Sequence, residues 1–345
     1  MQTARRMTLG ALLGVLLSAG PGLADPLRVV ATTSDLGALA EAVGGPDAEV
    51  TVLGAGTQNP HFVDPKPSFL RALAGADALV ETGLELEVGW VPPLIENARN
   101  ARVLAGAKGR IVAAEAVAPL DVPTGTVDRA MGDVHPYGNP HFLLDPIQGV
   151  RVAALLRDRF SDLRPEAAAG FAARYDAFRK SLGERLVGAA LAGKYDFEKL
   201  ALLAEHGRLA DFLRSQGDEG RLGGWLGALA SFRGAKAVGD HNVWPYFARR
   251  YGLEVVAYLE PKPGVPPTTK HLREVIDRMK AEKVGLILAT AYFDPSHARF
   301  VAGETGARVV EIANQVGARP GAEDYLAMCE YNVRTLAAAM KRGAS

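Results

Sequence analysis

The sequence predicts an α/β protein with two lobes, each containing a parallel sheet flanked by helices. The chain has 345 residues, which exceeds one ordinary domain and suits two. Short β-branched runs alternate with helical patterns in its first half, and the second half repeats this alternation. Such alternation is typical of βαβ units, whose strands lie parallel to one another.

Apolar periodicity places the individual elements of both halves. In the first half we expect strands at 27–33, 50–53 and 78–81, with helices at 35–43 and 67–73. In the second half we expect strands at 235–238, 253–259, 284–289 and 308–312, with helices at 243–251, 271–282, 296–304 and 324–342.

A longer helical pattern at 165–187 lies between the halves. Pro165 and Glu166 suit a helix start, and Phe171, Tyr175 and Phe178 fall on one face. A helix of roughly 23 residues reaches about 35 Å, enough to connect two lobes stiffly. An ordinary packing helix explains the pattern of these residues equally well.

Residues 1–24 have the pattern of a secretory signal peptide. Two arginines precede an apolar run at 7–17, and Gly22 and Ala24 supply the small residues of a cleavage site. The alternative is a transmembrane anchor. An anchor needs roughly 20 apolar residues, and this run is shorter than that. We expect an exported protein, placed most simply in a Gram-negative periplasm.

Charge and cysteine content exclude several classes of partner and site. Removing the signal segment, with its two arginines and no acidic residue, leaves 37 basic and 39 acidic residues. That balance argues against nucleic acid or an anionic membrane as a partner. Cys329 is the only cysteine, which excludes an internal disulfide and a zinc site of several cysteines.

Three of the seven histidines stand in settings that suit metal ligands. Asn-Pro-His-Phe occurs at 59–62 and again at 139–142, and each copy is followed by an Asp-Pro pair. Proline stiffens the backbone before His61 and His141, as a ligand of fixed direction requires. His241 follows a predicted strand, where ligands bind in open α/β sheets. Loop turns that happen to contain histidine, or a capping histidine at 241, remain the alternatives.

A fourth ligand is less evident from the residues. Asp294 lies beyond the strand predicted at 284–289 and is as well explained as the N-cap of the helix that begins at Pro295. A water molecule is another suitable fourth ligand. His135 could be an additional ligand, but we favour a position on a loop surface or at the entry to the site, and we expect the remaining histidines to be solvated or capping.

Further phrases make the chain resemble the zinc and manganese solute-binding proteins of ABC importers, the cluster A-I family. They are Thr32-Thr33-Ser34-Asp35, Pro60-His61 with Lys66-Pro67-Ser68, the run from Asn139 to Pro146, and His241 through to Tyr251-Gly252-Leu253. The resemblance covers essentially the mature chain.

The resemblance implies that His61, His141 and His241 are metal ligands and that the helix at 165–187 joins the lobes. It divides the chain into a signal peptide at 1–24, an N-terminal lobe at 25–163, a connecting helix at 164–192 and a C-terminal lobe at 193–345. It implies a non-enzymatic, monomeric binding protein whose partner is a membrane permease. A periplasmic metallochaperone that loads the site is an open alternative partner.

The cargo that the resemblance implies is Zn²⁺, because manganese-binding members usually have a carboxylate where His241 stands, and nitrogen-rich sites suit zinc. Binding of Mn²⁺ or Fe²⁺ on the same fold, and a zinc hydrolase with three histidines, are the competing interpretations. The family's usual fourth aspartate is replaced by Asn314. Since histidine ligands must be neutral, affinity for zinc is expected to fall below about pH 6.5.

Overall fold

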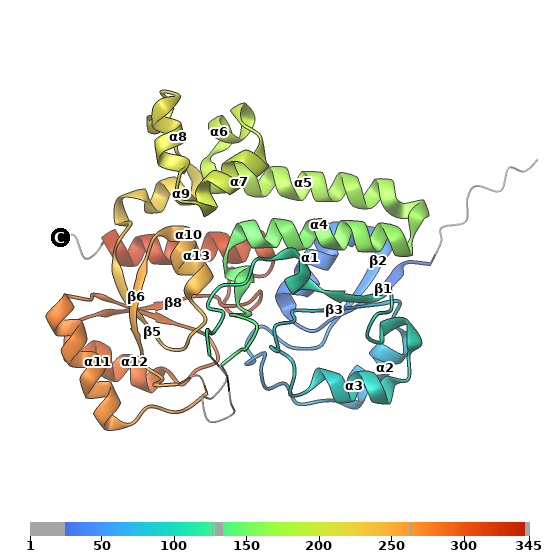
Figure 1. Cartoon of the computed structure of the whole chain (residues 1–345), viewed down its shortest axis with the longest axis horizontal. Helices are drawn as coiled ribbons and strands as arrows, with labels where there is room; N and C mark the ends of the chain where they lie inside the picture. The colour runs from blue at the N-terminus through green and yellow to red at the C-terminus, as the bar shows by residue number, and fades with distance from the viewer. Residues whose placement is uncertain (1–24, 126, 128–133, 263, 342–345) are drawn as a thin grey trace, which may run out of the picture.

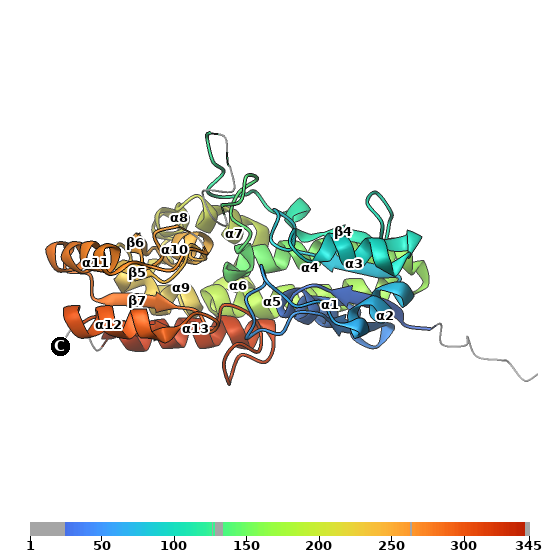
Figure 2. The same ribbon diagram turned by 90° about the horizontal axis from the view of Figure 1, so that it is seen from below.

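The computed structural model describes residues 25–125, 127, 134–262 and 264–341, and the predicted signal peptide lies outside them. The described chain forms two α/β lobes that lie end to end (Figure 1; Figure 2). Within it, no helix is both long and apolar enough to cross a bilayer.

The N-terminal lobe contains a parallel sheet with strand order β2-β1-β3-β4. Its elements are β1 (Leu27–Ala31), α1 (Ser34–Gly44), β2 (Ala48–Val52), α2 (Pro67–Gly75), β3 (Ala78–Glu81), α3 (Val91–Ala98), β4 (Arg110–Val112) and α4 (Pro146–Leu163). Val29 of β1 pairs with Val50 of β2 on one side and with Ala78 of β3 on the other. The strand predicted at 78–81 is confirmed, whereas β4 has only three residues and gave no signal in the sequence.

The C-terminal lobe repeats this plan with strand order β6-β5-β7-β8, again parallel. Its elements are β5 (Lys236–Gly239), α10 (Pro245–Tyr251), β6 (Glu254–Tyr258), α11 (Thr269–Glu282), β7 (Leu286–Ala289), α12 (Pro295–Thr305), β8 (Arg308–Glu311) and α13 (Tyr325–Lys341). The predicted fold class is therefore confirmed.

The helix predicted at 165–187 is observed as a short 3-10 turn, Pro165–Ala167, that leads into α5 (Ala168–Val187). Helix α5 packs on α1 and α4 at one end and on α9 (Gly224–Leu229) at the other, so it crosses from one lobe to the next (Figure 1). Three short helices follow, α6 (Ala189–Lys194), α7 (Phe197–Glu205) and α8 (Leu209–Ser215). Helices α6 and α8 stand on the far side of α5 from the sheets, whereas α7 contacts α5 and α10 (Figure 1).

The first Asp-Pro pair does not begin a helix, but the second does. Asp145 caps α4 by accepting a hydrogen bond from the Ile147 N–H at 3.0 Å, and Pro146 occupies the first helical position. Helix α2 begins only at Pro67, after Lys66, so Asp64 is not its cap.

One hydrophobic core continues through both lobes. It combines buried residues of β1 and α1 with aromatic residues of the C-terminal lobe, among them Trp244, Phe247 and Tyr325. Separate cores fill the space between the first sheet and α2 and α3, and between the second sheet and α11 and α12. Because the largest core is shared, the lobes cannot move far apart without exposing apolar surface to water.

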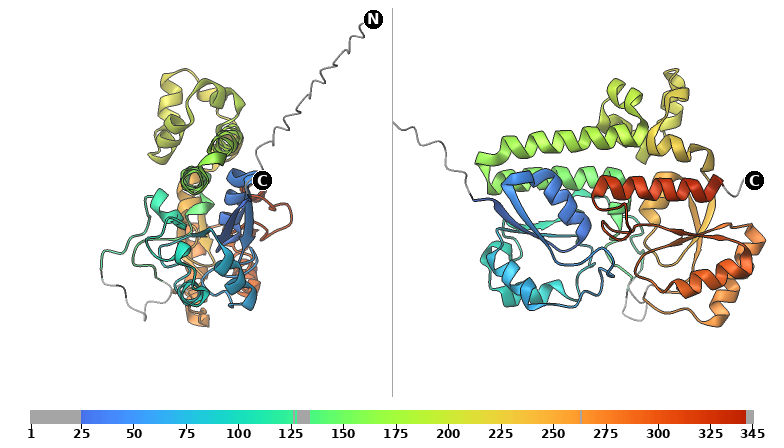
Figure 3. Two further views of the ribbon diagram at one scale, coloured as in Figure 1. Left: turned by 90° about the vertical axis from the view of Figure 1, so that its right-hand side faces the viewer. Right: turned by 180° about the vertical axis from the view of Figure 1, so that it is seen from behind.

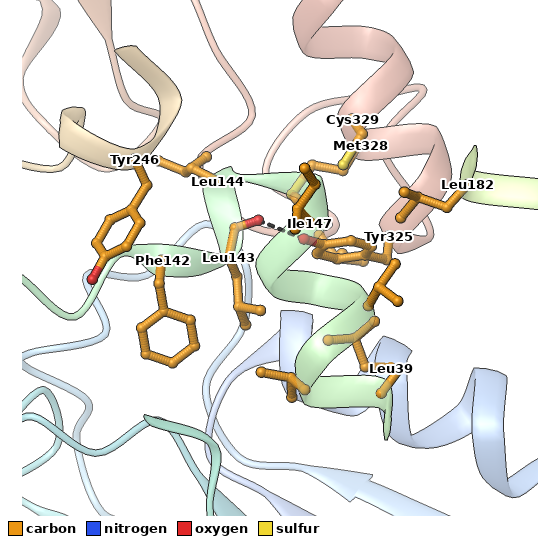
Figure 4. Packing of buried hydrophobic residues seen from close by; sticks show 14 of the residues in the cluster. Leu39, Phe142, Leu143, Leu144, Ile147, Leu182, Tyr246, Tyr325, Met328 and Cys329 are labelled. Atoms are coloured by element: carbon orange, nitrogen blue, oxygen red, sulfur yellow. Dashed lines mark hydrogen bonds between the residues drawn. The ribbon is translucent and has the colours of Figure 1, made fainter. Parts of the chain in front are cut away.

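Helix α13 strengthens this junction. It begins beside α1 of the other lobe and runs back over its own lobe (Figure 3). At its first residue, the Tyr325 hydroxyl donates a 2.7 Å hydrogen bond to the Leu143 carbonyl (Figure 4). Gly149 of α4 permits the close approach, since a Cβ there would lie 2.3 Å from the tyrosine oxygen.

A buried ion pair also joins the lobes. Arg250 of α10 donates to both carboxylate oxygens of Asp145, at 2.6 and 2.7 Å, and the two side chains are 1% and 0% exposed. Removing one partner of such a pair leaves an uncompensated buried charge, which costs far more than the pair itself contributes.

We therefore expect Arg250→Met to lower the free energy of unfolding by about 3–5 kcal/mol, as measured by urea denaturation of the metal-free protein. Arg273→Met, at an exposed position of α11, is the matched control and should change it by less than about 0.5 kcal/mol. Equal stabilities of the two variants would show that the Asp145 carboxylate is not an uncompensated charge after the arginine is removed.

A hydrogen bond between Asp35 and Val316 also joins the lobes, and its contribution to stability depends on pH. The Val316 N–H donates to the Asp35 carboxylate at 2.6 Å, and burial raises the pKa of Asp35 to about 7. The unfolded carboxyl group ionises near pH 3.8, so the stability that this group contributes is complete below that pH and is lost as the pH rises toward 7.

Asp35→Asn should therefore stabilise the protein relative to the wild type increasingly from pH 4 to 7, by up to roughly 2–4 kcal/mol above pH 7. Parallel thermal unfolding measurements of both metal-free proteins across this range test the expectation. A constant difference between them would mean that Asp35 titrates normally in the folded state.

Candidate metal centre

The repeated Asn-Pro-His phrase forms the same turn in both places. The Asn59 side-chain oxygen accepts the His61 N–H at 3.1 Å, and the Asn139 oxygen accepts the His141 N–H at 3.0 Å. Such asparagine turns, together with the intervening proline, fix the backbone of each histidine. The repeat is thus a structural device for aiming an imidazole ring.

Each loop is also anchored beyond its own turn. The Trp90 indole N–H donates to the Pro60 carbonyl at 2.9 Å, and the Asn139 amide donates to the Asn242 carbonyl of the other lobe at 2.8 Å. The second contact places the loop of His141 directly against the segment that carries His241.

His241 is held by its neighbour in the sequence. The buried Asp240 carboxylate accepts hydrogen bonds from the His241 N–H at 2.7 Å, from the Trp244 indole at 3.2 Å and from both donors of Thr290. The segment that follows β5 is therefore tied to the segment that follows β7. Burial raises the pKa of Asp240, and these hydrogen bonds oppose that effect.

The structure brings His61, His141 and His241 together between the lobes. One ring nitrogen from each lies within 4.8 Å of those of the other two. His61 and His241 are 7% and 3% exposed. The centroid of the His61 ring lies 5.3 Å from that of His141 and 5.9 Å from that of His241, so the three rings surround a common point.

His135 lies directly beside this cluster, a position that suits either an entry residue or an additional ligand. Its Nε2 lies 3.0 Å from His61 Nε2, and the ring is only partly exposed. Together with His141 and His241, His135 lines a polar cavity of about 50 Å³. Its separation of six residues from His141 was the sole sequence signal, because the loop between β4 and α4 has no periodic pattern.

The ring nitrogens that face away from the cluster have partners. His61 Nδ1 lies 2.8 Å from the Asn59 oxygen, and His241 Nδ1 lies 2.5 Å from Glu260 Oε2. His135 forms a hydrogen bond with the Leu84 backbone. Histidines that bind metals are oriented in this way by a partner on the second nitrogen, which leaves Nε2 free to coordinate. Glu260 was not predicted from the sequence.

Burial keeps several of these rings neutral. It lowers the pKa of His61 and His141 well below 6.5, and their proximity to the other histidines lowers it further. Burial also lowers the pKa of His135 to about 4. Neutral imidazole is the form that coordinates a metal ion.

Asp294 lies outside this cluster, whereas Asn314 lines a small cavity together with His141. Asp294 is exposed and caps α12, its carboxylate accepting the Ser296 N–H at 2.9 Å. Asn314 is buried and accepts the Ala291 N–H at 3.0 Å. The structure therefore gives each a hydrogen-bonding role within the C-terminal lobe.

Comparison with known proteins identifies the family. A model described as "Zinc-uptake complex component A periplasmic" matches residues 29–188 and 225–339, leaving out the segment with α6, α7 and α8. The manganese-binding lipoprotein MntA of Halalkalibacterium halodurans is 22% identical over 341 residues, covering 95% of each chain. The zinc-binding lipoprotein AdcA of Streptococcus pneumoniae is 23% identical over 317 residues, and the chain spans 55% of AdcA.

Solved structures share the fold. A crystal structure of ZnuA superposes with a TM-score of 0.67 at 22% identity, covering 91% of this chain and 99% of the other. The solute-binding protein FpvC of Pseudomonas aeruginosa, in complex with Mn²⁺, gives a TM-score of 0.65 at 20% identity, covering 92% of this chain and 100% of the other.

The family consists of transport proteins and not of enzymes, which removes the zinc hydrolase from consideration. The relatives named here include both a manganese binder and a zinc binder. The matched residues, the two-lobe fold and the histidine cluster between the lobes agree: this chain belongs to the ZnuA family of metal-binding solute-binding proteins of ABC importers.

Proposed function

We propose that this protein captures Zn²⁺ in the periplasm and delivers it to the permease of an ABC importer. The observation that carries the proposal is the convergence of His61, His141 and His241 between the lobes, with the Nε2 of His135 3.0 Å from that of His61. Four nitrogen donors with oriented rings suit the tetrahedral coordination that zinc prefers.

Donor chemistry supports zinc over manganese or iron. Imidazole suits zinc, whereas carboxylate, carbonyl and water oxygens suit Mn²⁺. Glu260 contacts the outer nitrogen of His241, so its charge strengthens that histidine as a donor while occupying no coordination position of its own. Mn²⁺ or Fe²⁺ binding remains the competing cargo that the first experiment distinguishes.

The fourth ligand in this proposal is His135, not Asp294. Asp294 was predicted from the sequence as a ligand or a cap, and its hydrogen bond to Ser296 supports the cap. The Nε2 of His135 already lies beside that of His61, within the range that two ligands of one zinc ion adopt.

The proposed partners follow from the family and the export signal. A permease receives the ion, and we propose that the binding protein acts as a monomer. Loading by a periplasmic metallochaperone is an alternative to direct capture. The predicted signal segment at 1–24 supports a periplasmic location.

Competition between zinc and manganese for the purified mature protein, monitored with a chromogenic chelator, tests the cargo. We expect one Zn²⁺ per chain that excess Mn²⁺ does not displace. His141→Ala should weaken zinc binding by at least about 100-fold, and His135→Ala by roughly 10- to 100-fold.

Asp294→Ala is the matched control for these variants. It should leave zinc affinity unchanged and lower stability by about 1 kcal/mol, the usual contribution of an N-cap. Weaker zinc binding in Asp294→Ala together with unchanged binding in His135→Ala would reverse the assignment of the fourth ligand. A preference for Mn²⁺ would overturn the proposed cargo.

The lowered pKa values also change the expected pH dependence. Folded histidines with a depressed pKa stabilise the protein above pH 6.5 and lose that contribution as the pH falls. Since protons compete weakly for the buried His61, His135 and His141, zinc affinity should persist to about pH 5.5 and fall as pH 4 is approached.

Chelator competition at pH 8, 6.5, 5.5 and 4.5 measures this profile. Histidines that titrate at 6.5 would each cost roughly tenfold in affinity by pH 5.5. A loss of that size for every ligand would show that the rings are protonated in the metal-free protein as readily as in free histidine.

A further inference from the structure

A cavity of about 510 Å³ lies at the carboxyl ends of all four strands of the second sheet. Its lining includes Asp240 after β5, Glu260 after β6, Thr290 after β7 and Glu311 at the end of β8. The chain passes from β5 outward to β6, and from β7 outward to β8 on the other side. Such a reversal between neighbouring strands, here β5 and β7, is where open parallel sheets bind ligands.

This cavity is separate from the histidine cluster but shares a wall with it. None of the four clustered histidines, all within the described chain, lines it. Asn59 and Glu260 do, and these residues hold the outer nitrogens of His61 and His241. An occupant would thus lie beside the metal centre without needing a metal ion to bind.

The walls combine apolar surface with charged side chains, among them two arginines, Arg299 and Arg319. Phe62, which is 65% exposed, and Phe293 contribute aromatic rings, and Pro266 and Pro267 add further apolar surface. Volumes of 300–1,000 Å³ with mostly apolar walls and a few polar groups are typical of small-molecule sites.

Three of the four carboxylates that line the cavity are already engaged by protein donors. Asp240 accepts four hydrogen bonds, Glu260 accepts from His241 and Gly264, and Asp294 caps α12. These three carboxylates therefore have little capacity to hold a cationic ligand.

Arg319 is less completely satisfied. Its guanidinium donates to the Thr290 carbonyl at 3.3 Å and lies 3.8 Å from the carboxylate of Glu311, which is itself half-exposed. Its Nε is buried and has no hydrogen-bond partner. A buried guanidinium donor at an apolar cavity favours a carboxylate, which accepts two parallel N–H groups.

From this arrangement we propose that the cavity binds a small organic acid, with its carboxylate on Arg319 and an aromatic or branched apolar body against Phe62 and Phe293. The ligand class is distinct from the metal cargo, and the proposal stands whichever metal the histidines bind.

The test uses the metal-free mature protein and three probes, benzoate, 3-phenylpropionate and 4-phenylbutyrate, with saturation-transfer NMR and calorimetry. We expect at least one to bind with a Kd below roughly 1 mM. The neutral 3-phenylpropionamide should bind at least about tenfold more weakly than 3-phenylpropionate, because it lacks the charge-assisted hydrogen bonds.

Two variants locate the binding. Arg319→Gln should weaken the best probe roughly tenfold or more, whereas Arg273→Gln on α11 should not. Phe62→Ala removes an exposed ring, so folding is retained, and it should also weaken binding, whereas Phe300→Ala, on the exposed surface of α12, should not. If Arg319→Gln fails to fold, the Phe62 pair decides.

Failure of all three probes to bind, or wild-type binding by the Phe62 and Arg319 variants, would overturn the proposal. Neither result would bear on zinc capture, because the metal is absent and the histidines are unchanged. Conversely, loss of the proposed metal specificity would leave the carboxylate measurements intact.

Discussion

Asp145 performs three tasks with one buried carboxylate. It caps α4, it holds Arg250 of α10 in a two-point ion pair, and it lies 3.6 Å from the guanidinium of Arg249. Since α4 follows His141 and α10 follows His241, the pair joins the two helices that come after these histidines. Because a charge with no exposure to solvent must keep its partner in one geometry, the pair also restricts the geometry of the adjoining metal centre.

Much of the fold follows from residue patterns. Strands such as 78–81, where every residue is buried, read clearly because parallel strands covered on both faces are continuously apolar. The three residues of β4 are too few to show any period, and Asp64-Pro65 resembles a helix start that the chain does not use. A capping motif makes a helix start possible, but tertiary packing determines whether the helix begins there.

The site was only partly predictable for a related reason. His61 and His141 carry a local signal, since each asparagine acts on a histidine two residues away. His135 and Glu260 contact histidines that are 74 and 19 residues away, and these contacts exist only once each lobe has folded. Asp294 lies in a cap motif that is complete in itself, so its sequence context could not distinguish a cap from a ligand.

The single core that runs through both lobes affects how fast the ion is bound and released. A binding protein whose halves open widely can discharge its cargo by opening, but here that motion would expose the residues around Trp244 and Tyr325 to water. The rings are held in place before the ion arrives, so little ordering accompanies capture and spontaneous escape is slow. We therefore expect release of the ion to require a distortion of the histidine cluster.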